Sequence, residues 1–115
     1  MNAHEFQVPD EHELIEFFGT EATERAVDDG YWCYEVAGAQ GTSLRFSLNL
    51  YERSVQTELR IGAVPIATVS HEMATRLRVE GGQIRCEFVC SECRTTLTIN
   101  AAHGYMPVWS TLRTK

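Results

Sequence analysis

The sequence contains no long apolar run, which excludes a membrane-spanning helix. No stretch approaches the roughly 18 consecutive apolar residues that such a helix requires. The first residues show neither the basic segment nor the apolar segment of a secretory signal, so we expect a cytoplasmic chain without membrane partners. With 115 residues of ordinary apolar and charged content, we expect one domain, residues 1–115, with its own core.

Basic residues are scarce in the first 30 positions. This segment has nine carboxylates and one arginine, a balance of −8, whereas residues 31–115 carry +2. Such a bias repels nucleic acid and favours a basic protein surface. The alternative is a solvated helix face that only keeps a small protein soluble. The candidate partner-binding carboxylates are Glu11, Glu13, Glu16, Glu21 and Glu24.

Motifs for common enzyme chemistry are missing. The chain has no nucleophile elbow, phosphate-binding loop, zinc-peptidase helix or dinucleotide fingerprint. His71 and Glu72 could pair as a base and the group that orients it, but no nucleophile can be named beside them. We therefore predict no catalytic residues and a protein that is not an enzyme.

There are only four cysteines. Cys90 and Cys93 have the spacing of half a zinc site, with Cys86 four residues before and His103 ten residues after. No second such pair is present, and Cys86 falls on an apolar strand position, so we predict free thiols and no cofactor. A zinc-stabilised domain that uses Cys86, Cys90, Cys93 and His103 is the alternative.

Helix signals are confined to the amino-terminal quarter. Asp10 can cap a helix and Glu13 follows at capping-box spacing, while Gly19 is suited to end it. Leu14, Ile15, Phe17 and Phe18 then share one face. A second short helix is predicted from Thr20 to Ala26.

The rest of the chain alternates with period two, as half-buried strands do. Leu44–Leu50 and Val55–Ile61 predict a hairpin with a loop at Tyr51–Ser54, which would pair Phe46 with Leu59. Gly81-Gly82 predicts a second hairpin with Leu77 opposite Cys86, and Cys86 is in turn expected opposite Leu97. The expected fold class is α+β, with one or two amino-terminal helices packed on an antiparallel β-meander of about seven strands. The apolar tail near Trp109 is expected to pack back on the domain as a last strand or as a short irregular segment.

Several segments together show a family likeness. They read Phe17-Phe18-Gly19, Asp29-Gly30-Tyr31-Trp32, Leu44-Arg45-Phe46-Ser47 and Glu52-Arg53-Ser54-Val55. Over residues 14–61 the chain resembles small stand-alone bacterial proteins of unassigned role, several of which resemble the immunity proteins encoded beside secreted toxins. The resemblance implies binding to a cognate toxin in the cytoplasm by surface complementarity, without catalysis. Its motifs are a helix end and a hairpin, so it identifies no binding residues.

Our interpretation is a small acidic protein-binding module for a basic partner such as a nuclease-like toxin. The candidate carboxylates would attract that partner, and Tyr31 and Tyr51 are candidate anchors, since tyrosine combines a large apolar area with a polar group. The alternative is that most aromatic residues belong to the core or to the rim of the sheet. The remaining alternatives are the zinc-stabilised domain and a homodimer joined through an exposed sheet edge.

Overall fold

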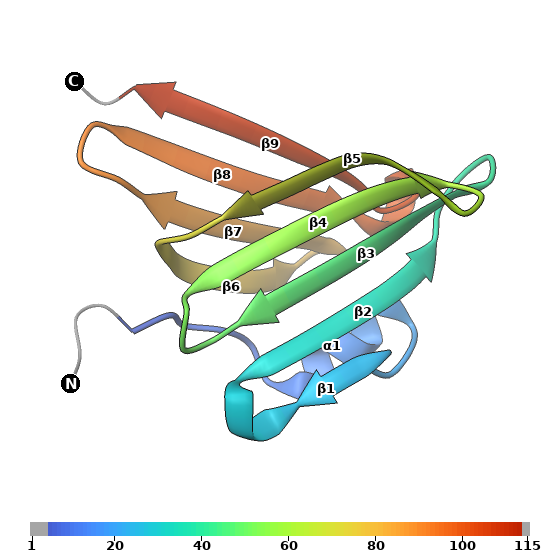
Figure 1. The fold of residues 1–115 in the computed structure, drawn as a ribbon, viewed down its shortest axis with the longest axis horizontal. Helices are drawn as coiled ribbons and strands as arrows, with labels where there is room; N and C mark the ends of the chain where they lie inside the picture. The colour runs from blue at the N-terminus through green and yellow to red at the C-terminus, as the bar shows by residue number, and fades with distance from the viewer. Residues whose placement is uncertain (1–4, 114–115) are drawn as a thin grey trace.

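In a computed structural model that describes residues 5–113, antiparallel strands form two sheets (Figure 1). The five-stranded sheet has the order β1-β2-β3-β4-β5 and the four-stranded sheet the order β6-β7-β8-β9. The bounds are β1 Glu24–Ala26, β2 Tyr31–Ala37, β3 Thr42–Asn49, β4 Ser54–Ile61, β5 Val64–His71, β6 Ala74–Glu80, β7 Gln83–Val89, β8 Cys93–Asn100 and β9 Met106–Arg113.

The α+β class is confirmed, but the number of strands is nine in the described range, not about seven, and they do not form one meander. The chain leaves the first sheet at His71 and enters the second at Ala74, through Met73 at a φ of 67°. Both sheets present an apolar inner face, and each face needs a cover. Alternation alone predicts a dry face, and it cannot distinguish one long meander from two sheets that cover each other.

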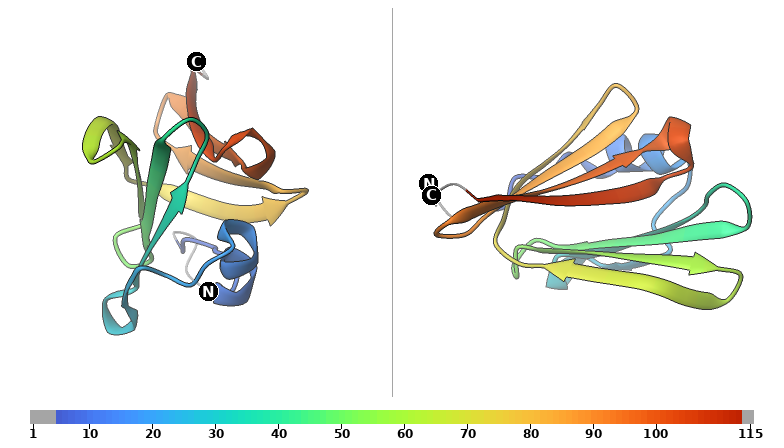
Figure 2. Two further views of the ribbon diagram at one scale, coloured as in Figure 1. Left: turned by 90° about the vertical axis from the view of Figure 1, so that its right-hand side faces the viewer. Right: turned by 90° about the horizontal axis from the view of Figure 1, so that it is seen from above.

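Helix α1, Glu11–Phe18, begins and ends where the sequence predicts. The Asp10 carboxylate accepts a hydrogen bond from the Glu13 amide at 2.9 Å, and the Gly19 amide donates to the Ile15 carbonyl at 2.8 Å. The helix contacts both β2 and β6, and it lies where the two sheets diverge (Figure 2). It therefore closes the space between the sheets with its buried residues Leu14, Phe17 and Phe18.

The second predicted helix, from Thr20 to Ala26, is wrong. Residues 24–26 form β1, in which Arg25 pairs with Trp32, and the Thr23 amide donates to the Cys33 carbonyl at 2.7 Å. A helix of two turns is marginal by itself. The unpaired edge of β2 offers this segment a full set of backbone partners, which the local sequence does not reveal.

The central hairpin forms with its predicted faces but with a different loop. Phe46 pairs with Thr57 and Leu48 with Val55, so the turn comprises residues 50–53 and the predicted loop at Tyr51–Ser54 was wrong by one residue. The Asn49 side chain fixes this turn, because its oxygen accepts from the Tyr51 amide at 3.0 Å and the Glu52 amide at 2.9 Å. The pairing shifts by two positions, which leaves every side chain on its predicted face.

The predicted pairing in the four-stranded sheet is confirmed. Leu77 pairs with Cys86, and Cys86 with Leu97. The apolar tail forms β9, which pairs with β8. A single core of buried residues then links α1 to the inner faces of both sheets, and Phe46 lies fully buried within it.

We predict that Phe46→Ala lowers the free energy of unfolding by about 3–4 kcal/mol, because it removes a buried ring that contacts Phe18 and leaves a cavity. Ser47→Ala, on the outer face of the same strand, should cost under about 0.5 kcal/mol. Urea denaturation of both variants measures the difference. Equal losses would contradict the assignment of faces.

Candidate partner-binding site

Three chain connections meet at one end of the five-stranded sheet. They are the 3-10 helix η1, Val27–Asp29, the β3–β4 turn at residues 50–53, and the β5–β6 connection at residues 72–73. Backbone hydrogen bonds join them, from the Leu50 amide to the Gly30 carbonyl at 2.8 Å and from the Ala74 amide to the Arg53 carbonyl at 2.9 Å. The backbone of these connections is therefore held in a fixed arrangement.

Tyr51 is the most exposed aromatic residue of this end, with 70% of its surface accessible. Its ring packs on Gly30, where a Cβ atom would lie 3.1 Å from two ring carbons. Gly30 also has a φ of 68°, so glycine is required there both for the backbone conformation and for the close approach of the ring. One face of the Tyr51 ring thus packs on Gly30, while the other face is exposed to solvent.

Two adjoining hollows lie at this end of the sheet and share Tyr31, Asn49 and Glu52, and Tyr51 lines the one beside η1. One measures about 470 Å³ beside η1, and the other about 460 Å³ along the outer face of β3, β4 and the end of β5. Their linings include four carboxylates and neither lysine nor arginine. We call this surface the tyrosine–carboxylate face: Asp28, Asp29, Tyr31, Tyr51, Glu52 and Glu72.

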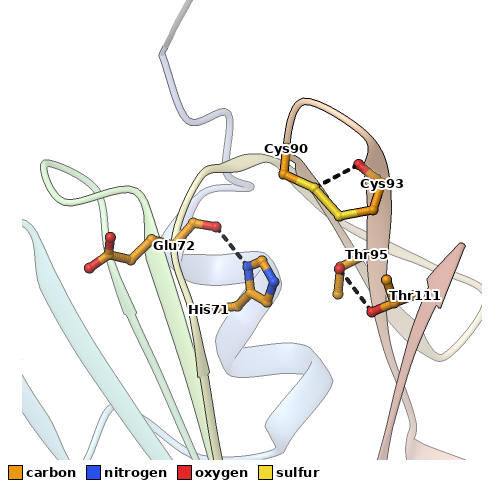
Figure 3. Close-up of a disulfide and its surroundings, with 6 residues drawn as sticks. All are labelled: His71, Glu72, Cys90, Cys93, Thr95 and Thr111. Atoms are coloured by element: carbon orange, nitrogen blue, oxygen red, sulfur yellow. Dashed lines mark hydrogen bonds between the residues drawn. A yellow bond between two sulfur atoms is a disulfide. The ribbon is translucent and has the colours of Figure 1, made fainter. Parts of the chain in front are cut away.

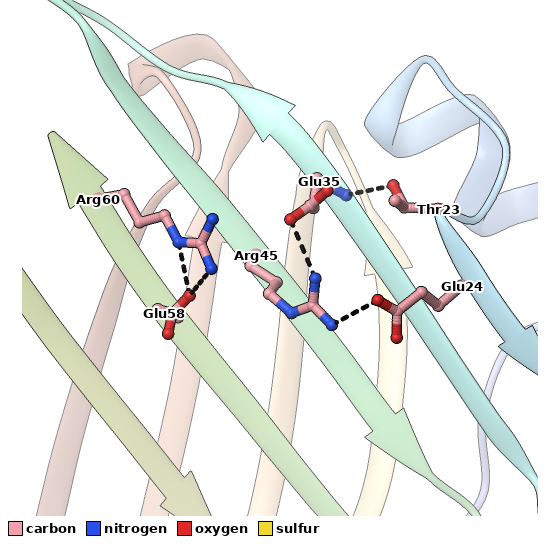
Figure 4. Close-up of polar contacts among 6 residues, drawn as sticks. All are labelled: Thr23, Glu24, Glu35, Arg45, Glu58 and Arg60. Atoms are coloured by element: carbon pink, nitrogen blue, oxygen red, sulfur yellow. Dashed lines mark hydrogen bonds and ion pairs between the residues drawn. The ribbon is translucent and has the colours of Figure 1, made fainter. Parts of the chain in front are cut away.

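The centre of the same outer face is different, because its charges are paired (Figure 4). Arg45 contacts Glu24 and Glu35, each at 3.0 Å, and Arg60 contacts Glu58 at 2.6 Å. The hydrogen bond to Glu24, opposed by desolvation, raises the pKa of Arg45, which stays charged. At the end of the sheet that carries Tyr51, the two hollows are lined by carboxylates without lysine or arginine, and Arg53 of the β3–β4 turn lies outside both linings.

Both tyrosine anchors predicted from the sequence, Tyr31 and Tyr51, lie in this face, but the predicted carboxylates do not converge. Glu11 holds Arg25 at 3.1 Å and accepts from the Trp32 indole at 3.3 Å, while Glu24 holds Arg45. Of the others, Glu13 and Glu16 are exposed on α1, and Glu21 is exposed between α1 and β1.

Tyr31 is half-buried above the fully buried Cys33. Burial, and then the neighbouring Cys33 thiol, raise the pKa of Tyr31, and burial also raises the pKa of Cys33. Both groups therefore stay neutral at physiological pH. Tyr31, which lines both hollows, therefore carries a neutral hydroxyl rather than a phenolate, and this group interacts with Cys33 and Arg45.

The sequence analysis did not identify Glu52 or Glu72 as partner-binding candidates, and it treated Asp28 and Asp29 only as part of a total charge. One signal was available for Glu52, since it lies in the loop of the strongest hairpin. Glu72 comes into the site because β5 pairs with β4, a long-range contact that local patterns do not specify.

The predicted free thiols of Cys90 and Cys93 are wrong, because these residues form a disulfide across the β7–β8 turn (Figure 3). The turn brings the two residues together, and the Cys90 amide donates to the Cys93 carbonyl at 3.2 Å.

Cys33 and Cys86 are free and buried. Cys86 lies within the core, and His103 belongs to η2, Ala101–His103, after the far end of β8, so the alternative zinc ligands do not meet. Within residues 5–113, no group of three or more His, Cys, Asp or Glu is placed to hold a metal ion.

The described part of the chain contains no helix long and apolar enough to span a membrane. Neither the protein-family models nor the curated proteins match the chain. Among solved structures, this two-sheet α+β fold is similar to a chain of the contact-dependent growth inhibition toxin–immunity protein complex from Klebsiella pneumoniae 342. The TM-score is 0.82 at 23% identity, over 92% of this chain and 96% of that one. At this identity the likeness establishes the fold, and at that level it confirms the resemblance to immunity proteins.

We predict that denatured, unreduced protein titrates two thiols and that denatured, reduced protein titrates four. The native protein should react slowly, because Cys33 and Cys86 are buried and burial raises the pKa of both, which disfavours the reactive thiolate. Four thiols without reductant would contradict the disulfide.

Proposed function

We propose that this chain is an immunity protein that binds a toxin in the cytoplasm and neutralises it without catalysis. The observation that carries the proposal is the similarity of nearly the whole chain to a chain of a toxin–immunity protein complex. The sequence likeness over residues 14–61 supports the same role independently.

The immunity role fits this chain better than the toxin role. The sequence lacks the common catalytic motifs, and its net charge is −6. An inhibitor can act by surface complementarity alone, so it requires a preorganised binding surface rather than a reactive group.

The tyrosine–carboxylate face is the proposed binding surface. Tyrosines are enriched among the residues that dominate binding energy, and Tyr51 is exposed yet fixed by its contact with Gly30. An ordered anchor loses little conformational freedom when a partner covers it. The two hollows beside it can receive side chains of the partner.

The proposed partner is basic, as a nuclease-like toxin would be. Asp28, Asp29, Glu52 and Glu72 would contact it directly. The amino-terminal carboxylates would act mainly through their summed charge on the rate of encounter, which salt screens over about 8 Å at physiological ionic strength. These steering residues are Glu11, Glu13, Glu16, Glu21 and Glu24.

The first prediction for this function concerns Tyr51. Tyr51→Ala should weaken binding to the toxin encoded by the neighbouring gene about 30-fold, which corresponds to a loss of about 2 kcal/mol at a central anchor. The matched control is Leu112→Ala, which truncates a side chain that is 69% exposed on the outer face of β9 and should leave affinity unchanged. Calorimetric titration gives the affinities, and urea denaturation should show both variants folded.

If Tyr51→Ala binds the product of the neighbouring gene with the same affinity as the wild type, Tyr51 is not part of the interface. If the wild-type protein neither binds that product nor protects cells that produce it, the immunity role itself is contradicted.

The second prediction separates contact from steering with two variants of equal charge change. Asp28→Lys with Glu52→Lys should slow association and also speed dissociation, because it alters the contact surface. Glu13→Lys with Glu16→Lys, on exposed positions of α1, should slow association only. Association and dissociation rates measured against salt concentration test this. Association that responds to neither salt nor either reversal would contradict a basic partner.

A further inference from the structure

Strand β5 is an exposed and uncharged edge on an acidic protein. Residues 61–70 contain no charged side chain, although the chain has 26 charged residues, and all ten of these positions are exposed. Val64 is 61% and Ile66 50% exposed. This surface has no part in the tyrosine–carboxylate face apart from the end of the strand at Ser70 and His71.

The apolar exposure arises because the five-stranded sheet extends beyond its neighbour. β9, the last strand of the four-stranded sheet, lies against β4, where the Trp109 indole donates to the Thr57 hydroxyl at 2.9 Å. His71 still contacts the rings of Phe88 and Trp109. The residues of β5 that precede His71 are exposed on both faces.

Two of the other sheet edges, β1 and β6, carry protection that most of β5 lacks. β1 is three residues long with Glu24 and Arg25, and β6 is flanked by Gln7, whose amide donates to Thr75 and whose carbonyl accepts from Leu77. On β5, Pro65 and the irregularity opposite Leu59 and Arg60 protect only the first residues. From Ala67 to Ser70, within the described chain, one edge of the strand pairs with β4 and the other presents unpaired backbone groups.

The distribution of charge on the protein indicates which molecule binds at the β5 edge. A basic toxin gains most from the carboxylate-rich end of the sheet, whereas a second copy of this chain carries the same net charge of −6. Two acidic copies can approach each other most easily through a surface without charge. Antiparallel pairing of a strand with itself across a two-fold axis also satisfies the closed symmetry of most homodimers.

We propose that β5 is a homodimer interface, at which it pairs antiparallel with β5 of a second copy to form one continuous ten-stranded sheet. The two-fold axis is perpendicular to this sheet, so the outer faces of both copies lie on the same side. Val64, Ala67 and Val69 of each copy then form a continuous apolar strip on the inner side. Each copy keeps its own tyrosine–carboxylate face, and the dimer does not depend on the proposed toxin.

The test is the mass of the full chain in solution across a range of concentrations, measured by sedimentation equilibrium. We expect twice 13.0 kDa at high concentration. Ala67→Lys places a lysine from each copy at the new junction and should raise the dissociation constant of the dimer at least about tenfold, since charges on an edge strand block pairing. Ser110→Lys, at an exposed position of the β9 edge, has the same charge change and should leave the dimer intact.

Hydrogen exchange identifies the edge directly. Amides in residues 67–71 of the wild type should become more protected as concentration rises, while amides of β9 and those of Ala67→Lys should not. A mass of one chain at every concentration overturns the proposal. A dimer that survives Ala67→Lys, or that dissociates equally with Ser110→Lys, also overturns it, and urea denaturation confirms that both variants are folded.

Discussion

The packing of two apolar sheet faces over the aromatic side of one short helix is the constraint on which the structure depends. Neither sheet can leave its inner face in water, and the sheets diverge where α1 lies between them. Phe18 stacks on Tyr34 at 4.9 Å between ring centroids, and the Tyr105 hydroxyl donates to the Phe17 carbonyl at 3.1 Å. Without α1, the inner faces of β2 and β6 would be open to solvent along one side.

Local patterns in the sequence predicted the elements whose boundaries are set by their own residues. The capping pattern from Asp10 to Gly19 predicts α1, and Gly81-Gly82 predicts the register from Leu77 to Cys86. Two failures were local, namely the loop at Tyr51–Ser54 and the thiols of Cys90 and Cys93, and the others concern contacts between distant segments. β1 depends on the free edge of β2, and the division into two sheets depends on which apolar faces meet. The candidate site shows the same division between local and long-range contacts. Its tyrosines were predicted from the sequence, whereas Glu72 lies near them only because β4 pairs with β5.

The distribution of charge is more informative than its total. Arg45, Arg60 and Arg25 neutralise carboxylates on or beside the five-stranded sheet, so a simple count overstates the charge available to a partner at Glu11 and Glu24. At the end that carries Tyr51, carboxylates line the hollows without lysine or arginine in the lining. Ion pairs at the centre and carboxylate-lined hollows at one end make the charge pattern of this face uneven from its centre to its end.

The placement of Tyr51 and Glu52 on a turn outside the core affects how such a protein can evolve. The turn is held by backbone groups and by Asn49, so the outward side chains can be exchanged with little effect on the packing of Phe46 and its neighbours. Recognition can then diverge rapidly while the architecture persists. A chain with the same fold at 23% identity is the pattern that such separation would leave.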